Sequence, residues 1–355
     1  MISLDSAQDQ REARVNSFDK IQKNPATEDR GTPHHAGKRF RNLPNGTLRK
    51  PRRRTYMSFI LRMMRYGREK VTIPDGHVIP QADAARQMQS LLSTDTDFMT
   101  WLGQACFLIR IDGKIILTDP YLSSHASPTR MAGPKRFVEP GLHLNDLPEI
   151  DYMVLSHNHY DHLDTRTVRQ LRDRHSDMTI VVPLRLGRFF HRRGFSNVIE
   201  MDWWDSHDTG PFRIHALPSQ HWSKRTPFDR NRSLWASFSF EGQRNKIFFS
   251  GDTGYAPLFK DIGRDYGPFD YSLVGIGAYE PREIMKAHHT NPEEAVLIGN
   301  DVQSRNIVAM HWGTVRLTDE PLFEPPGRFL QASREAGYDD HQSWVMSIGE
   351  SRALD

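Results

Sequence analysis

The sequence predicts an α/β fold in which two mixed sheets pack together and helices cover them on the outside. Three observations indicate this fold. Short apolar runs separated by turn residues begin at about Phe98, a strand, a helix and a strand follow one another after residue 150, and further apolar runs recur up to Met310. Strands that alternate with helices are typical of layered α/β proteins, and the early hairpins add antiparallel strands. At 355 residues the chain has room for one such domain and an extension.

The N-terminal part differs from the rest in composition and charge. Residues 1–36 are polar with few large apolar side chains, so we expect them to be disordered. Residues 37–95 form a basic extension that we expect to pack on the core or to face a membrane, and residues 96–355 form the layered domain. Residues 1–70 carry a net charge of +10 and the remainder carries −7, so the two parts are expected to face different partners.

A basic stretch from Lys38 to Lys70 contains 12 basic side chains and a single acidic one. It includes Arg52-Arg53-Arg54 and the apolar residues Phe59-Ile60-Leu61. Basic residues beside apolar anchors attract anionic lipid surfaces, at about 1 kcal/mol per basic residue near the headgroups. An arm that merely straps across the layered domain explains the stretch equally well. Nucleic-acid binding ranks third, because few aromatic residues are interleaved, and no nucleic-acid partner is expected.

The elements of the layered domain are expected in the following order. Asp112-Gly113 lies between two apolar runs and predicts a hairpin. Thr167 to Arg174 has helical composition, and Thr179 to Pro183 predicts the next strand. A helix is expected to begin at Thr290 to Glu294, where proline and two glutamates occupy the first turn. Further strands are expected at residues 212–217, 234–240, 246–250, 271–274 and 307–310.

Composition argues against several classes of protein. The single cysteine, Cys106, rules out an intrachain disulfide and thiolate-based metal sites, and its apolar neighbours indicate a buried core residue. No segment approaches the ~18–20 uninterrupted apolar residues of a membrane-spanning helix. The N-terminus lacks the pattern of a secretory signal, so we expect a cytoplasmic protein that is peripheral at most to a membrane. A homodimer is left open.

The most informative segment is Leu-Ser-His-Asn-His-Tyr-Asp-His at residues 155–162. It places three imidazoles and a carboxylate directly after a short apolar run, and that run is expected to be a buried strand. Imidazole nitrogen and carboxylate oxygen are ligands that suit zinc, and such a dense group can serve two ions roughly 3.5–4 Å apart. The alternative, a histidine-rich surface turn, is disfavoured because further ligands follow downstream. The candidate ligands in this segment are His157, His159, Asp161 and His162.

Three more candidate ligands stand where apolar runs end, which is where a strand delivers a side chain to the edge of a sheet. They are His221, Asp252 and His311. With the first segment they make five histidines and two aspartates, enough for two ions with positions left for water and substrate. His288 or His289, just ahead of the expected helix start, is a candidate substrate contact or proton donor. His34, His35, His207 and His215 are interpreted as non-ligands.

Several motifs resemble the metallo-β-lactamase superfamily, namely Trp-Leu-Gly-Gln-Ala-Cys-Phe (101–107), Leu-Thr-Asp-Pro (117–120), the histidine-rich segment, Phe-Ser-Gly-Asp-Thr-Gly (249–254) and Met-His-Trp-Gly (310–313). Others resemble the N-acyl-phosphatidylethanolamine-hydrolysing phospholipase D group, including Leu-Pro-Ser-Gln-His-Trp (217–222), Gly-Ala-Tyr-Glu-Pro-Arg (277–282) and Gly-Lys-Arg-Phe-Arg-Asn (37–42). The resemblance covers roughly residues 37–340. Gln104 and Cys106 depart from it, because relatives more often show histidine and a small residue there.

The resemblance implies an αββα sandwich with two zinc ions, although manganese and iron accept the same ligands. His157, His159 and His221 would hold the first ion, Asp161, His162 and His311 the second, and Asp252 would bridge them. Asp161, Asp252 and His289 would be catalytic, and His289, Tyr279 and Arg225 would contact substrate. The implied reaction is hydrolysis of a phospholipid phosphodiester that releases N-acylethanolamine and phosphatidic acid. A lactonase, a soluble phosphodiesterase, and a non-catalytic membrane- or nucleic-acid-binding protein are the alternatives.

Overall fold

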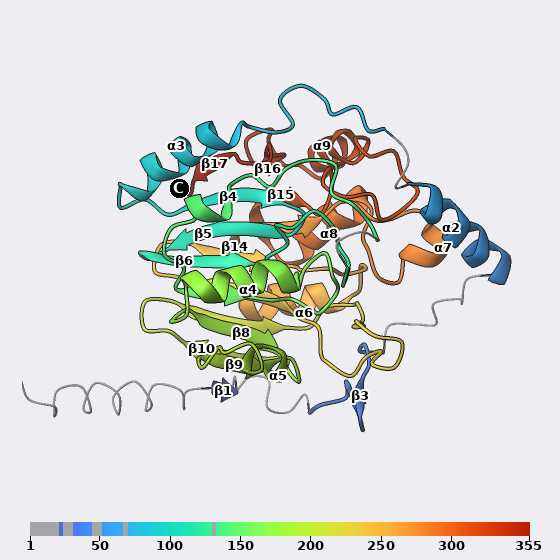
Figure 1. Ribbon diagram of the computed structural model, residues 1–355, viewed down its shortest axis with the longest axis horizontal. Coiled ribbons are helices and arrows are strands. Elements are labelled where there is room, and N and C mark those ends of the chain that lie inside the picture. Colours follow the sequence, from blue (N-terminus) through green and yellow to red (C-terminus); the bar gives the residue numbers. More distant parts are fainter. Residues whose placement is uncertain (1–20, 24–30, 45–51, 67–69, 130–132) are drawn as a thin grey trace, which may run out of the picture.

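The computed structural model describes residues 21–23, 31–44, 52–66, 70–129 and 133–355, and these form two large mixed sheets flanked by helices (Figure 1). The prediction of an α/β sandwich of two mixed sheets is confirmed. Within the described ranges, no helix is both long and apolar enough to cross a membrane.

The first sheet has seven strands in the order β17-β4-β5-β6-β7-β8-β9. Its early strands are antiparallel, and β6 to β9 run parallel. The bounds are β4 (Phe98–Gly103), β5 (Cys106–Ile111), β6 (Lys114–Thr118), β7 (Tyr152–Val154), β8 (Thr179–Pro183), β9 (Val198–Met201) and β17 (Ser351–Ala353).

The second sheet has eight strands in the order β1-β10-β11-β12-β13-β14-β15-β16, of which β13 to β16 are parallel. The bounds are β1 (Ile21–Lys23), β10 (Asp205–Asp208), β11 (Arg213–Leu217), β12 (Ser237–Glu241), β13 (Lys246–Phe249), β14 (Phe269–Gly275), β15 (Ser304–Met310) and β16 (Ser343–Trp344).

Strand β5 shows why the first sheet is covered on both faces. Its residues are apolar almost without interruption, and successive side chains of a strand point to opposite faces. Phe107 and Ile109 join the core between the two sheets, whereas Cys106 and Leu108 join a second core beneath the outer helices. Cys106 is fully buried, as expected of a core residue.

Helices cover the outer faces of both sheets (Figure 1). The outer core of the first sheet takes apolar residues from α3 (Gln81–Leu92), α4 (Thr165–Arg174) and α5 (Gly187–His191). On the second sheet, α8 (Pro292–Asp301) packs against β14 and β15, with α6 (Leu258–Tyr266) and α9 (Pro325–Glu335) beside it. Asn291 caps α8 by accepting a hydrogen bond from the amide of Glu294, which explains the start predicted there.

Most of the expected elements are present, with shifted ends. The hairpin at Asp112-Gly113 joins β5 to β6, and both turn residues have positive φ, as a two-residue hairpin turn requires. The strand expected at residues 234–240 begins only at Ser237. Several elements were not predicted, including α3, α6, α9 and the edge strands β1, β16 and β17.

The described N-terminal segments pack on the layered domain. Strand β1 pairs with β10, and β2 (His35–Ala36) forms a small hairpin with β3 (Arg39–Phe40). These two segments fall wholly or partly within residues 1–36, for which disorder is a prediction; residues 1–20 and 24–30 lie outside the described residues. Helix α2 (Arg53–Tyr66) lies beside the short helix α7 (Arg282–Met285).

Candidate metal centre

The expected ligands come from the ends of strands in both sheets. The segment His157–His162 follows β7 of the first sheet, whereas His221, Asp252 and His311 follow β11, β13 and β15 of the second. Because the two sheets pack face to face, these strand ends meet at one edge of the sandwich. The structure brings all seven predicted ligands together there, in two groups that share Asp252.

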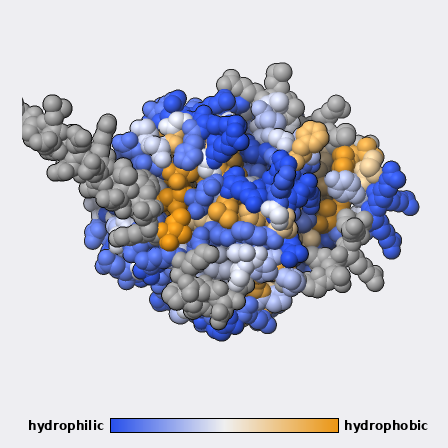
Figure 2. Space-filling model, turned by 90° about the horizontal axis from the view of Figure 1, so that it is seen from below, coloured by the Kyte–Doolittle hydropathy of each residue, from blue (hydrophilic) through white to orange (hydrophobic). Residues whose placement is uncertain are grey.

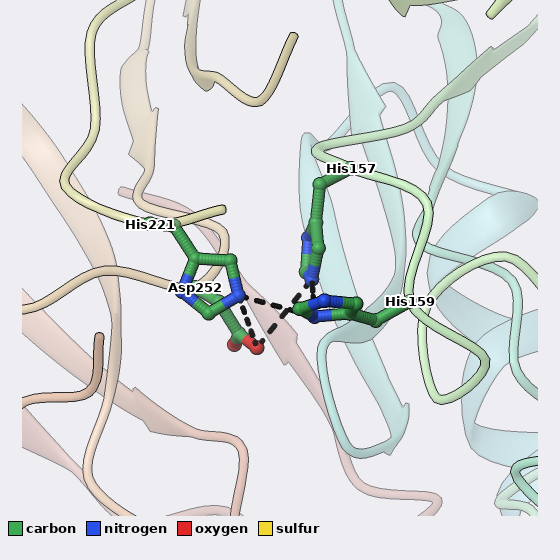
Figure 3. Close-up of side chains that lie close together, drawn as sticks. All are labelled: His157, His159, His221 and Asp252. Carbon is green, nitrogen blue, oxygen red and sulfur yellow. Dashed lines mark hydrogen bonds and ion pairs between the residues drawn. The ribbon is translucent and has the colours of Figure 1, made fainter. Parts of the chain in front are cut away.

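The first group consists of His157, His159, His221 and Asp252, whose side chains point toward one another (Figure 3). His157 Nε2 lies 2.8 Å from His159 Nδ1, and His221 Nε2 lies 3.2 Å from the same atom. Asp252 Oδ2 is 3.7 Å from Nε2 of both His157 and His221. Three ring nitrogens and a carboxylate oxygen therefore surround one point.

The second group consists of Asp161, His162, His311 and Asp252. His311 Nε2 lies 3.1 Å from Asp252 Oδ1 and 3.2 Å from Asp161 Oδ2. His162 Nε2 lies 3.0 Å from Asp252 Oδ2, yet it is buried and makes no hydrogen bond. A buried imidazole nitrogen without a hydrogen-bond partner is costly unless something else occupies its lone pair, and a metal ion fits that requirement.

Charge differs between the two groups of ligands. Burial lowers the pKa of His157 and His221 well below the ordinary value, so both rings are held neutral. Burial alone would raise the pKa of Asp252, but the neighbouring His162, His311 and His289 lower it well below its usual range. Burial alone would lower the pKa of His162 and His311, but Asp252 and Asp161 raise it, to about 9 for His311. Neutral imidazoles and ionised carboxylates are the forms that bind divalent cations, so the donor set fits a pair of such ions that displace these two protons.

Asp119 orients a ligand, although it was not predicted as a site residue. Asp119 Oδ2 accepts a hydrogen bond from His162 Nδ1 at 2.6 Å, and Asp119 also receives the amide and hydroxyl of Ser156. A carboxylate behind a ligating imidazole fixes the ring's tautomer and orientation. The sequence signal was Asp119 in the Leu-Thr-Asp-Pro motif at the end of β6.

Gln104 contacts two ligands of the second group, although the sequence analysis singled it out only as a departure from the family pattern. Its amide nitrogen lies 2.9 Å from Asp161 Oδ2 and 2.8 Å from His311 Nε2. Its backbone has φ of 56°, uncommon for a residue with a side chain. The carbonyl of Gln104 accepts the amide of His311, so this strained turn ties the two sheets together beside the ligands.

Asn42 holds the first group from the N-terminal side. Its amide nitrogen donates to the carbonyl of His221 at 3.0 Å, and its amide oxygen accepts from the backbone N–H of His221 at 3.2 Å. The same oxygen accepts from Trp235 Nε1. The side chain of Asn42 thereby fixes the backbone of a ligand, although only its place in the Gly-Lys-Arg-Phe-Arg-Asn motif pointed to it.

His289 lies next to the ligands but is absent from both ligand groups. Its Nδ1 is 4.0 Å from Asp252 Oδ2, and its ring centroid is 5.2 Å from that of His221. His288 contributes mainly through its backbone, because its carbonyl accepts a hydrogen bond from His221 Nδ1. The ring of His289 is nearer to that of His221 than the ring of His288 is, with centroid distances of 5.2 and 6.0 Å, and a catalytic role for His289 stays a prediction.

Arg225 and Tyr279, expected to contact substrate, make other contacts in the structure. Arg225 donates to the carbonyls of Asn158 and Leu163 and to the hydroxyl of Thr165, and its guanidinium lies 3.9 Å from the centroid of the Tyr160 ring. These contacts clamp the ligand segment from behind. Tyr279 is buried, with the Arg328 guanidinium 4.9 Å from its ring centroid. Substrate contact by either residue stays a prediction.

Comparison with known proteins agrees with this geometry. Residues 114–312 match the model of the β-lactamase superfamily domain. The chain is 40% identical over 239 residues to N-acyl-phosphatidylethanolamine-hydrolysing phospholipase D 1 of Caenorhabditis elegans, covering 64% of this chain and 67% of that one. It is 33% identical over 265 residues to the mitochondrial enzyme of the same name from Saccharomyces cerevisiae, covering 73% of this chain but 56% of that one.

Solved structures share the fold at low sequence identity. A metallo hydrolase from Ignicoccus hospitalis superposes with a TM-score of 0.56 at 21% identity, over 73% of this chain and 99% of that one. A diiron β-hydroxylase from Streptomyces venezuelae gives 0.55 at 21% identity, over 74% of this chain and 54% of that one. At this identity the likeness establishes the fold and leaves the metal and the reaction undetermined.

Proposed function

Because the chain belongs to the metallo-β-lactamase superfamily and is a metal-dependent hydrolase, we propose that it is a zinc enzyme that hydrolyses the phosphodiester of N-acyl-phosphatidylethanolamine. The observation that carries this proposal is the pair of ligand groups sharing Asp252, in a chain related to phospholipases with that activity. Two adjacent cations suit a phosphodiester, whose negative charge grows on the oxygens around phosphorus as a nucleophile attacks.

When bound, the two ions supply a nucleophilic water at neutral pH and neutralise the developing charge on the phosphoryl oxygens. The chain's own residues do the rest. Asp161 and Asp252 accept hydrogen bonds from the attacking water and orient it toward phosphorus. The bond from phosphorus to the oxygen of the N-acylethanolamine breaks, and the departing oxygen takes up a proton.

The attacking water supplies that proton, and His289 is suited to stabilise the departing oxygen by a hydrogen bond. It is buried beside Asp252 but is outside both ligand groups, so its ring is available to the substrate. Burial lowers its pKa well below the ordinary value, although the charge of Asp252 opposes the shift. A neutral imidazole can donate a hydrogen bond to the leaving oxygen and stabilise the charge that forms there.

Hydrolysis assays with three classes of substrate test the proposal. The zinc-loaded protein is incubated with N-acyl-phosphatidylethanolamine, a short soluble phosphodiester and a lactone, and products are identified by mass. We expect N-acylethanolamine and phosphatidic acid from the lipid, in equal amounts. Hydrolysis of the lactone alone, or of the soluble diester without the lipid, would replace this proposal with another hydrolase on the same centre.

Helix α2 supports an encounter with a lipid surface. Arg53, Met57 and Leu61 are exposed and spaced four residues apart, so they lie along one side of the helix, and the exposed Arg54 is adjacent to them. Tyr56 is also half exposed, whereas Phe59 is buried. Figure 2 shows hydrophobic and hydrophilic residues side by side at its right-hand edge, where α2 lies in Figure 1. This amphipathic surface suits an anionic membrane.

The inner side of α2 is fastened to the layered domain, as the strap interpretation expects. Arg62 forms an ion pair with Asp319, and the hydroxyl of Thr55 donates to Glu283. The two interpretations are therefore compatible: one side of the helix holds the domain and the other faces outward. We propose that this outward side brings the enzyme to its lipid substrate at the membrane surface.

A further inference from the structure

A second cluster of metal-ligating side chains lies outside the centre described above. His34 and His35, at the start of the hairpin β2–β3, both reach Asp202, which is 168 residues further along the chain from His34. His34 Nε2 lies 2.6 Å from Asp202 Oδ1, and His35 Nε2 lies 2.8 Å from Asp202 Oδ2. The His34 side chain is only 1% exposed and that of Asp202 13%, whereas His35 is 34% exposed.

We propose that His34, His35 and Asp202 form an additional site for a divalent transition-metal cation such as zinc. Two imidazoles and one carboxylate are a donor set of that class, whereas magnesium and calcium prefer oxygen ligands alone. Three protein ligands leave a fourth position for water. The partly exposed ring of His35 gives the cation a route from solvent, which the fully buried His34 does not.

The charges around Asp202 favour a cation. Within the described ranges, Asp202 forms ion pairs with His34 and His35 and with no lysine or arginine. The carboxylate also accepts the backbone amide of Trp203 at 2.9 Å. Burial alone would raise the pKa of Asp202, but hydrogen bonding to His34 and the charges of His34 and His35 lower it, so Asp202 stays ionised. A largely buried anion whose neighbours are imidazoles gains most from a cation placed between them.

The spacing of the donors is close to that of the main centre. His157 Nε2 and His159 Nδ1, both ligands there, lie 2.8 Å apart, as do His35 Nε2 and Asp202 Oδ2. If the donor atoms of either group move apart by a few tenths of an ångström, a zinc ion fits between them with metal–ligand bonds of about 2.0–2.2 Å.

One feature makes the additional site weaker than the main centre. His34 Nδ1 is buried without a hydrogen-bond partner, and it must carry the ring's proton when Nε2 binds a cation. A ligating histidine normally donates that proton to an acceptor, and loss of such support lowers metal affinity by about 10–100-fold. In the main centre His162 and His221 have acceptors for Nδ1, and His311 shares the feature of His34.

The site would act on the main centre through the hairpin it fastens. Seven residues beyond His35, Asn42 holds the backbone of the ligand His221 by two hydrogen bonds. Phe40 is tied in turn to Asn231 by hydrogen bonds in both directions. A cation between His34, His35 and Asp202 would anchor the other end of this segment and so stabilise the position of His221.

Metal counting tests the proposal on the full-length protein without an affinity tag. The protein is equilibrated with a small excess of zinc, desalted and analysed for zinc per chain. We expect three equivalents, and two in His35→Gln. Glutamine can still donate a hydrogen bond to Asp202 Oδ2, but its amide is a poor ligand for zinc. This variant therefore distinguishes a metal site from a contact made only by hydrogen bonds. His215→Gln is the control, because His215 pairs with Glu241 at 2.9 Å without a second histidine, and three equivalents should remain.

Stepwise removal by a chelator adds a second measurement. One equivalent should leave the wild-type protein at a chelator concentration about 10-fold or more below that needed for the other two, and this early step should be missing from His35→Gln. If His35→Gln does not fold, Asp202→Asn should show the same loss of one equivalent. Two equivalents or fewer in the wild-type protein, or three in His35→Gln, would overturn the additional site. Neither result depends on which substrate the enzyme hydrolyses.

Discussion

Asp252 contacts both halves of the metal centre. Oδ2 faces His157 and His221 of the first group and His162 of the second, and Oδ1 faces His311 of the second. We expect Asp252→Asn to hold clearly fewer than two metal equivalents and to lose hydrolysis, because a neutral amide cannot offset the charge of two cations. Elemental analysis and an assay on one preparation check this prediction. An active variant with full metal content would show that the carboxylate does not bridge.

His289 separates metal binding from chemistry. We expect His289→Ala to lower turnover by about 10²-fold while the metal content stays at the wild-type value, because the ring is beside the ligands without being one of them. His288→Ala is a matched control, since its side chain is next in sequence and its contribution is a backbone carbonyl. Loss of metal from His289→Ala would make it a ligand, and unchanged turnover would leave it no part in the reaction.

At the scale of single residues, the sequence predicted the ligands better than their supports. His157, His159, Asp161 and His162 lie within six positions, so their grouping is visible in the sequence itself. Gln104, Asn42 and Asp119 contact ligands that are between 43 and 207 residues away. Such contacts arise only when segments far apart in the sequence are placed side by side, which no local pattern encodes.

Among the elements, strands β11, β12 and β13 are linked by three titratable side chains. Glu241 of β12 pairs with His215 of β11 and with Lys246 of β13. The hydrogen bond from His215 is the main reason that the pKa of Glu241 falls from 4.5 to about 2.

A carboxyl group whose pKa is lowered by folding stabilises the protein above its unfolded pKa, and that contribution is lost as the pH falls toward the folded value. We therefore expect Glu241→Gln to be less stable than the wild-type protein at pH 7, by about 1 kcal/mol or less since the carboxylate is partly exposed. The difference should shrink between pH 4.5 and about 2. Urea denaturation at pH 7, 5 and 3 measures it, and a constant difference at all three values would contradict the assignment.

Helix α2 gives the second prediction at this scale. Changing Arg52, Arg53 and Arg54 to Glu should weaken binding to anionic vesicles and reduce its dependence on salt, while hydrolysis of a short soluble phosphodiester is retained. Arg169, Arg172 and Arg174 on α4 are also exposed, so their change to Glu provides a control with the same charge difference. Equal vesicle binding by both variants would remove the membrane role. Unfolding of the α2 variant alone would indicate that the helix serves only as a strap.

The order of strands and helices from Phe98 onward was largely predictable, because buried strands are short apolar runs and α8 has a capped start. The N-terminal segments and the edge strands were not. Strand β1 has three residues and β17 three, and both are held by pairing with strands far away in the sequence. Helix α3 has only two fully buried residues, Ala84 and Met88, so its apolar face is too narrow to stand out.

For the whole molecule, the metal centre joins the two sheets. The first sheet contributes His157, His159, Asp161 and His162, and the second contributes His221, Asp252 and His311. Ligand binding stabilises the native state by about 4 kcal/mol when the free ligand exceeds its dissociation constant 1,000-fold. We therefore expect removal of zinc with a chelator to lower the melting temperature, and re-addition of zinc, but not of calcium, to restore it. An unchanged melting temperature after verified removal would contradict this.

The position of the centre between the sheets also affects how the protein is made. A chain that has been synthesised only as far as β9 contains four of the seven ligands and can bind metal only loosely, because the remaining three emerge later from the ribosome. Full metal affinity, and with it hydrolysis, arises only once both sheets have docked in the correct register. A newly synthesised or misassembled copy is thus kept inactive by the same geometry that makes the finished hydrolase work.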